Sequence, residues 1–286
     1  MMHRRENEMP GVSDPVSLVN EEREKEVRAI SWNVRGFEKP EKRQAVKHLT
    51  SQYSPKFLFL QKTKLQFISD RMVNHLWGDG NYKWLAAHLE GSSRELISIW
   101  CQNFLQIDNF MIDRRFILVI GKIQGFDVNV SFVNIYAPTD VNETVEFWND
   151  LLQVLRATKA IWCLGGDFNA EKILISILDA FPLTLLWFNL WSSLRVGLMD
   201  LPMSEGDYTW FNLCENVIFS KLDRFFLAME FLEPYPDLIQ RCLPASIFDH
   251  NPIMICLECY NWGPKPFRFY IHWLDDRSFK DMFISA

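Results

Sequence analysis

The sequence has no excess of positive charge. Its 286 residues carry 30 Lys and Arg against 36 Asp and Glu, which gives a formal net charge of −6 at pH 7. Proteins that bind phosphate backbones without sequence selectivity gain most of their affinity from positive charge. The composition therefore excludes tight binding of nucleic acid through bulk charge, and it leaves room for a local basic face.

The sequence also lacks the paired cysteines of a structural zinc site. Cys256 and Cys259 form a single C-x-x-C without a second pair or a nearby pair of histidines, so a zinc site would lack half of its ligands. The N-terminal residues are polar and charged, so we expect no signal peptide and interpret the cysteines as reduced thiols of an intracellular protein. The six cysteines are Cys101, Cys163, Cys214, Cys242, Cys256 and Cys259.

No apolar run is long enough to cross a membrane. Residues 173–198 are unusually apolar, but Asp179, Pro182 and Arg195 interrupt them. Their longest uncharged run is shorter than the roughly 20 residues that a bilayer span needs. We therefore predict no transmembrane helix and no membrane partner. The 48% hydrophobic residues are ample for the core of one large domain.

Strand and helix patterns are mixed along the chain from Val27. Residues 27–34 alternate like a strand that ends before Gly36, helical spacing begins at Pro40 and recurs at 142–156, and residues 57–60 form a short apolar strand. This mixture favours a layered α/β or α+β fold. Residues 1–26 have the composition of a disordered leader. Further strands are predicted at 83–87, 95–101, 116–123, 127–136, 160–164, 208–211, 221–227 and 252–257.

Several polar motifs follow directly after apolar strands, where loops gather side chains at one edge of a rigid sheet. Taken singly, each motif is weak: G-D-x-N is common in plain turns, and an isolated Asp-His pair is more typical of a surface turn than of a catalytic site. Their order along the chain carries the information. The motifs are ISWNVRG (30–36), LQKTK (60–64), NIYAPTD (134–140), GGDFNAE (165–171), SKLDRFFLAMEF (220–231) and FDHNPIM (248–254).

In this order and spacing the motifs resemble the endonuclease/exonuclease/phosphatase (DNase I-like) superfamily, and most closely the endonuclease domain of plant LINE-type (non-LTR) retrotransposons. The segment WGPKPFRF (262–269) is similar to the stretch that follows this domain in those elements. The resemblance implies one αββα sandwich with two sheets face to face and helices outside. It places the domain at 27–260 and a C-terminal extension at 261–286.

The resemblance also implies an active site that hydrolyses DNA phosphodiesters with Mg²⁺. His250, oriented by Asp249, would act as the base or as the acid facing the phosphate, since an imidazole held by a carboxylate gains basicity and a fixed tautomer. Asp167 and Asn169 would alternate on one side of an extended segment and point at one water or phosphate. Tyr136 would stabilise an oxygen of the phosphate or of the leaving group.

Two further positions complete the site that the resemblance implies. Asn33 would contact substrate and help to hold the metal together with Asp249. Asp223 matches another acidic position, and an ion pair with neighbouring Arg224 is its alternative role. DNA is the expected partner, the protein is expected to be a monomer, and nuclear localisation follows only from the DNA substrate of the family.

The pattern is broken where the family carries its principal metal ligand. Family members have LQET at this motif, and Lys62 stands here in place of the glutamate. An ammonium at the ligand position opposes Mg²⁺ binding, so the sequence predicts a degenerate endonuclease with impaired activity. The alternatives are an inactive remnant with weak nucleic-acid binding and a phosphatase acting on a small phosphoester. Residues 170–199 do not resemble the family at all, so their native folding is left open.

Overall fold

The computed structural model describes residues 27–78, 80–88, 94–124, 128–169, 197–212, 218–244 and 249–257. Several sequence predictions fall on residues outside these ranges. They concern the leader at 1–26, most of the apolar segment at 170–199, Cys214, Cys259 and the extension at 261–286.

The first sheet has seven strands in the order β10-β14-β15-β1-β2-β4-β3. Its centre pairs β1 (Ala29–Asn33) with β2 (Phe57–Leu65) in parallel, so that Asn33 lies opposite Gln61, while β15 (Ile253–Leu257) runs antiparallel on the other side of β1. The remaining strands are β3 (Tyr82–His88), β4 (Arg94–Cys101), β10 (Met203–Ser204) and β14 (Leu238–Cys242).

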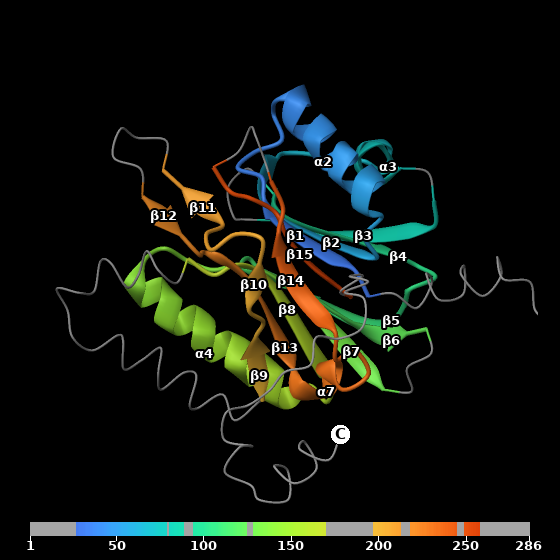
Figure 1. The fold of residues 1–286 in the computed structure, drawn as a ribbon, viewed down its shortest axis with the longest axis vertical. Helices are drawn as coiled ribbons and strands as arrows, with labels where there is room; N and C mark the ends of the chain where they lie inside the picture. The colour runs from blue at the N-terminus through green and yellow to red at the C-terminus, as the bar shows by residue number, and fades with distance from the viewer. Residues whose placement is uncertain are drawn as a thin grey trace, which may run out of the picture.

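The second sheet has six strands in the order β5-β6-β7-β8-β13-β9. Its centre pairs β7 (Asn129–Tyr136) with β8 (Ile161–Asp167) in parallel, which sets Tyr136 opposite Asp167, and β13 (Asp223–Ala228) runs antiparallel to β8. The others are β5 (Leu105–Ile112), β6 (Phe116–Ile123) and β9 (Leu198–Asp200). A separate hairpin, β11 (Trp210–Phe211) with β12 (Phe219–Ser220), projects from the body (Figure 1).

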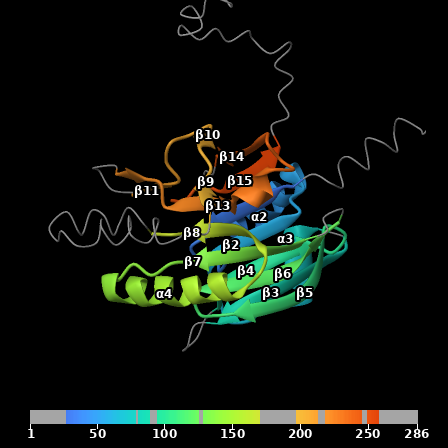
Figure 2. The ribbon, with the colours of Figure 1, turned by 90° about the horizontal axis from the view of Figure 1, so that it is seen from below.

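The two sheets pack face to face, and helices cover their outer faces (Figures 1 and 2). Helices α2 (Pro40–Tyr53) and α3 (Asp70–Trp77) cover the first sheet, and α4 (Val141–Ala157) covers the second. A short helix, α7 (Met229–Leu232), follows β13. None of the described helices is long and apolar enough to cross a bilayer. The four-layer αββα arrangement predicted from the resemblance is confirmed.

Local sequence explains where the two long helices begin. Pro40 occupies the first turn of α2, where its missing N–H costs nothing. The carboxylate of Asp140 caps α4 by accepting hydrogen bonds from the N–H groups of Asn142 and Glu143. Both helices bury one apolar face, which is why the spacing of apolar residues predicts them.

Phenylalanine rings fill the space between the sheets. Phe132 lies near the centre of this core, with its ring centroid 4.6 Å from Phe57, 6.0 Å from Phe104 and 6.3 Å from Phe231. Buried polar contacts also cross the core beneath the rim, where Gln61 Nε2 donates to Asn134 Oδ1 at 2.8 Å and Asn134 Nδ2 donates to the carbonyl of Ile97 at 2.9 Å. The rim above these contacts holds the ends of β1, β2, β7 and β8, so the sandwich brings the motif residues together there.

Candidate active site

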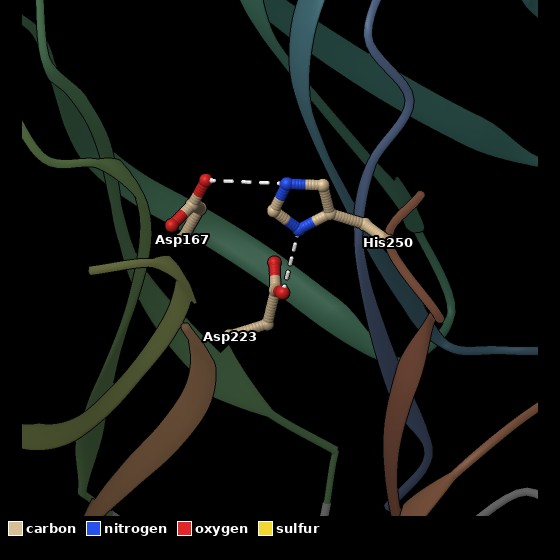
Figure 3. Close-up of side chains that lie close together, drawn as sticks. All are labelled: Asp167, Asp223 and His250. Atoms are coloured by element: carbon tan, nitrogen blue, oxygen red, sulfur yellow. Dashed lines mark hydrogen bonds and ion pairs between the residues drawn. The ribbon is translucent and has the colours of Figure 1, made fainter. Parts of the chain in front are cut away.

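Four of the expected residues converge at the rim between the sheets. Asn33 Nδ2 donates to Asp167 Oδ2 at 2.7 Å and lies 3.4 Å from His250 Nε2. His250 Nδ1 lies 2.8 Å from Asp223 Oδ2, and Nε2 lies 4.0 Å from Asp167 Oδ2 (Figure 3). All four residues are buried, with at most 1% of each residue exposed. Asn33 ends β1 of the first sheet and His250 lies in the segment just before β15, whereas Asp167 and Asp223 come from β8 and β13 of the second sheet.

The carboxylate that orients His250 is Asp223 and not Asp249. The sequence-based assignment of Asp249 to this task is therefore wrong. Consecutive residues in extended chain project to opposite sides, and the Asp249 carboxylate instead contacts the Arg35 guanidinium and accepts a hydrogen bond from Trp210 Nε1 at 3.0 Å. Arg224, the alternative partner of Asp223, pairs with Asp200.

The backbone around Asp223 holds its carboxylate in place. Thr209 Oγ1 accepts hydrogen bonds from the N–H groups of Leu222 and Asp223, both at 3.0 Å. Among the described residues, Asp223 Oδ1 has no hydrogen-bond partner. The backbone carbonyl of His250 accepts a hydrogen bond from Trp32 Nε1 at 3.0 Å, which fixes the backbone at this position.

Burial and neighbouring charges act in opposite directions on the imidazole. Burial lowers the pKa of His250, but the carboxylates of Asp223, Asp167 and Asp249 outweigh burial and raise this pKa above its ordinary value. Burial raises the pKa of Asp223, and His250 opposes that rise. The pair is therefore arranged to retain a shared proton above the pH at which a free imidazole loses it.

Asn169 does not lie on an extended strand beside Asp167 as predicted. Its backbone adopts the left-handed conformation, with φ of 49°, which asparagine tolerates better than most residues. The N–H of Asn169 donates to Asp167 Oδ1 at 3.0 Å, and its side-chain amide donates to the carbonyl of Ala137 at 2.7 Å. Asn169 thus closes a turn that holds Asp167.

Tyr136 and Lys62 lie together at the same rim. The ammonium of Lys62 is 5.7 Å from the centre of the Tyr136 ring, within the range of a cation–π contact. Lys62 lies in an irregular stretch of β2 and has a φ of 54°, which is unusual for a residue with a side chain. The Tyr136 side chain is half-buried, in contrast to the four converging residues.

The residues of this rim do not fit Mg²⁺. Asp167, Asp223 and His250 offer one ligand atom each within 4.8 Å of one another, a set that could hold a metal ion. Mg²⁺ requires oxygen ligands that are able to face it. Here Asn33 Oδ1 accepts the Arg35 N–H, both Asp167 oxygens accept protein N–H groups, and Asp249 contacts Arg35. The cationic side chains of Lys62 and Arg35 thus occupy the metal-binding end of the site, which is the part of the rim where the metal ligands were expected.

Sequence reasoning missed three residues that shape the rim: Arg35, Thr209 and Trp210. Arg35 lies within the ISWNVRG motif, two positions after Asn33, so its place in the motif was a usable signal. Thr209 directly precedes the β11–β12 hairpin and Trp210 is its first residue, whereas Asp223 follows the hairpin. Their roles depend on contacts across the fold, and no local pattern marks them.

No protein family model matches the chain, and no curated protein matches it. Solved structures do match its fold. The endonuclease domain of TRAS1, a telomere-specific non-LTR retrotransposon, aligns at a TM-score of 0.56 and 12% identity over 81% of this chain and 98% of that one. This chain shares the DNase I-like αββα fold of these structures.

Two other DNase I-like structures align over similar lengths. The AP endonuclease LMAP from Leishmania major aligns at a TM-score of 0.62 and 14% identity, over 87% of this chain and 92% of that one. TDP2 of D. rerio, crystallised with a single-stranded DNA product, aligns at a TM-score of 0.58 and 16% identity, over 81% of this chain and 98% of that one. At these identities the shared property is the DNase I-like fold.

Proposed function

We propose that this chain is a DNA endonuclease domain of retrotransposon origin in which the acid–base end of the active site is retained and phosphodiester hydrolysis is impaired at the metal-binding end. The observation that carries the proposal is the convergence of Asn33, Asp167, Asp223 and His250 through contacts that cross the two sheets. The likeness to the TRAS1 endonuclease domain and to TDP2 with its DNA product supports DNA as the partner.

The retained end suits proton transfer. With Nδ1–H donating to Asp223, the Nε2 atom of His250 is the accepting nitrogen, and it faces Asn33 and Asp167. A water held at Nε2 would lose a proton to the imidazole, and the protonated ring would then stabilise phosphate charge. The amide of Asn33 keeps Asp167 aligned with this position.

The altered end accounts for the impairment. At about 4 Å and an effective dielectric constant near 20, a unit charge and a divalent ion interact by roughly 8 kcal/mol, so replacing a carboxylate by an ammonium reverses a contribution of about that size. Lys62 supplies this ammonium, and Arg35 engages Asp249 beside it. This arrangement also favours the second candidate function, DNA binding without turnover.

Nicking of supercoiled plasmid in Mg²⁺ tests the proposal. We expect Lys62→Glu to nick orders of magnitude faster than the wild type, and we expect Lys62→Glu/His250→Ala to lose this gain. Lys64→Glu is the matched control, because Lys64 is exposed, has a similar backbone conformation and undergoes the same change of charge. If Lys62→Glu folds, as judged by circular dichroism, and nicks no faster than the wild type, the endonuclease assignment is wrong.

A further inference from the structure

The loop that carries Arg35 is fixed against the strand that carries Lys62. The N–H of Val34 donates to the carbonyl of Gln61 at 3.1 Å, and the N–H of Gly36 donates to the carbonyl of Lys62 at 2.7 Å. These bonds extend the β1–β2 pairing beyond the end of β1 at Asn33. Arg35 and Lys62 are therefore held on neighbouring segments at one rim.

A second lysine fixes the conformation of this loop. Lys42 Nζ donates to the carbonyls of Val34 at 3.0 Å and Arg35 at 2.8 Å. Arg35 and Lys62 both have positive φ, at 43° and 54°. Backbone strain of this kind persists where the surrounding contacts enforce it, and it is frequent at ligand sites. The two cations are thus held by the fold rather than carried on a freely moving loop.

Arg35 neutralises the buried carboxylate and still faces solvent. Its guanidinium contacts Asp249, whose side chain is 7% exposed, while the Arg35 side chain itself is 40% exposed. A guanidinium has several N–H donors in a planar fork that matches phosphate oxygens, so one ion pair leaves donors for a second anion. Asp249 therefore holds Arg35 in position at the rim.

Lys62 brings a second positive charge to the substrate-facing residues. Its ammonium lies over the ring of Tyr136, which is the register partner of Asp167 on the neighbouring strand. We propose that this rim binds a DNA phosphate directly through Arg35 and Lys62, in place of a divalent cation. The inference rests on the proposed function because it assigns the phosphate to the same site.

Fluorescence anisotropy with a labelled single-stranded oligonucleotide tests the inference, and excess EDTA is compared with excess MgCl₂. We expect the wild type to bind equally well in both. Lys62→Gln should weaken binding in EDTA by roughly tenfold or more, because it removes one charge-assisted contact. The slope of log affinity against log salt should also fall by about 1. Lys64→Gln, the matched control, should change neither quantity.

The 5′ end of the oligonucleotide distinguishes two kinds of bound phosphate, a terminal monoester and an internal diester. Tighter binding of a 5′-phosphorylated strand than of its 5′-hydroxyl form assigns the site to a terminal monoester, whereas equal binding assigns it to an internal diester. Arg35→Gln should weaken either form, and circular dichroism verifies that this variant folds.

Two results overturn the inference. One is wild-type binding that EDTA abolishes, and the other is the absence of binding in both buffers. Failure of the proposed function looks different, because Lys62→Glu would then gain no nicking in Mg²⁺ even if the wild type binds DNA in EDTA.

Discussion

The imidazole of His250 is held by a carboxylate 27 residues earlier in the chain, with Nδ1 at 2.8 Å from Asp223 Oδ2. The adjacent residue Asp249 faces Arg35 and Trp210 instead. Asp223 and Asp249 both lie within sequence motifs, but they have separate tasks. Asp223 orients the imidazole and raises its pKa, and Asp249 holds the Arg35 guanidinium.

The stability of the folded protein should fall as the pH rises above about 6.5, the pKa of an unperturbed imidazole. Because the folded-state pKa of His250 is raised, its stabilising contribution is complete below the unfolded pKa and is lost as the pH rises through the folded one. Urea unfolding across this range should show a weaker dependence on pH for His250→Gln than for the wild type. His48→Gln, which changes an exposed histidine, should retain the wild-type dependence.

Removing the Asp223 charge should lower the pKa of His250 more than removing the Asp249 charge. Asp223 contacts the ring directly and is the largest of the influences that raise this pKa, whereas Asp249 is the smallest of the carboxylate contributions. Titration of the His250 ring protons by NMR in Asp223→Asn and Asp249→Asn measures both effects. An equal or larger fall in Asp249→Asn would contradict the assignment of Asp223 as the orienting group.

Gly166→Ala should destabilise the protein by about 3 kcal/mol. A Cβ atom at Gly166 would lie 2.0 Å from the carbonyl oxygen of Ile135, which is backbone on the paired strand and is unable to move aside. Gly80→Ala is the matched control, since a Cβ there meets nothing within 4 Å. Chemical denaturation of both variants measures the difference, and a cost for Gly166→Ala as small as that for Gly80→Ala would refute the close approach of β7 and β8.

Phe132→Ala should cost about 3–5 kcal/mol because it opens a cavity in the aromatic core between the sheets. The Phe132 ring contacts those of Phe57, Phe104 and Phe231, and its side chain is fully buried. Phe110→Ala on β5, where the side chain is 53% exposed, should change stability by no more than about 0.5 kcal/mol. Comparable losses from the two substitutions would place the core elsewhere.

Several elements with a regular apolar pattern could be predicted from the sequence, although β14, which also alternates, was missed. The predicted strand at 116–123 has the bounds of β6, and the predicted helix at 142–156 falls within α4. Strand β5 was missed because most of its residues are exposed and a register shift between Ile107 and Asn109 breaks the alternation. Helix α3 was missed because eight residues are too few to show a clear helical period.

For the site, the sequence could predict the members but not their pairing. Motif order identified Asn33, Asp167, Asp223 and His250, and the structure brings these four together. Which carboxylate faces His250 depends on how the two sheets pack, and no local pattern records that contact. The role of Arg35 also depends on its contact with Asp249, which lies more than 200 residues later in the chain. The sequence alone does not show that contact.

The Asn33–Asp167 contact joins β1 to β8, and the His250–Asp223 contact joins the segment before β15 to β13, so the geometry of this site depends on how the two sheets pack against each other. A slip of the sheets by a fraction of a side-chain length would disconnect the imidazole while every strand kept its own ladder of hydrogen bonds. A chain with loosened core packing would thus retain its far-ultraviolet spectrum and lose the contact between His250 and Asp223.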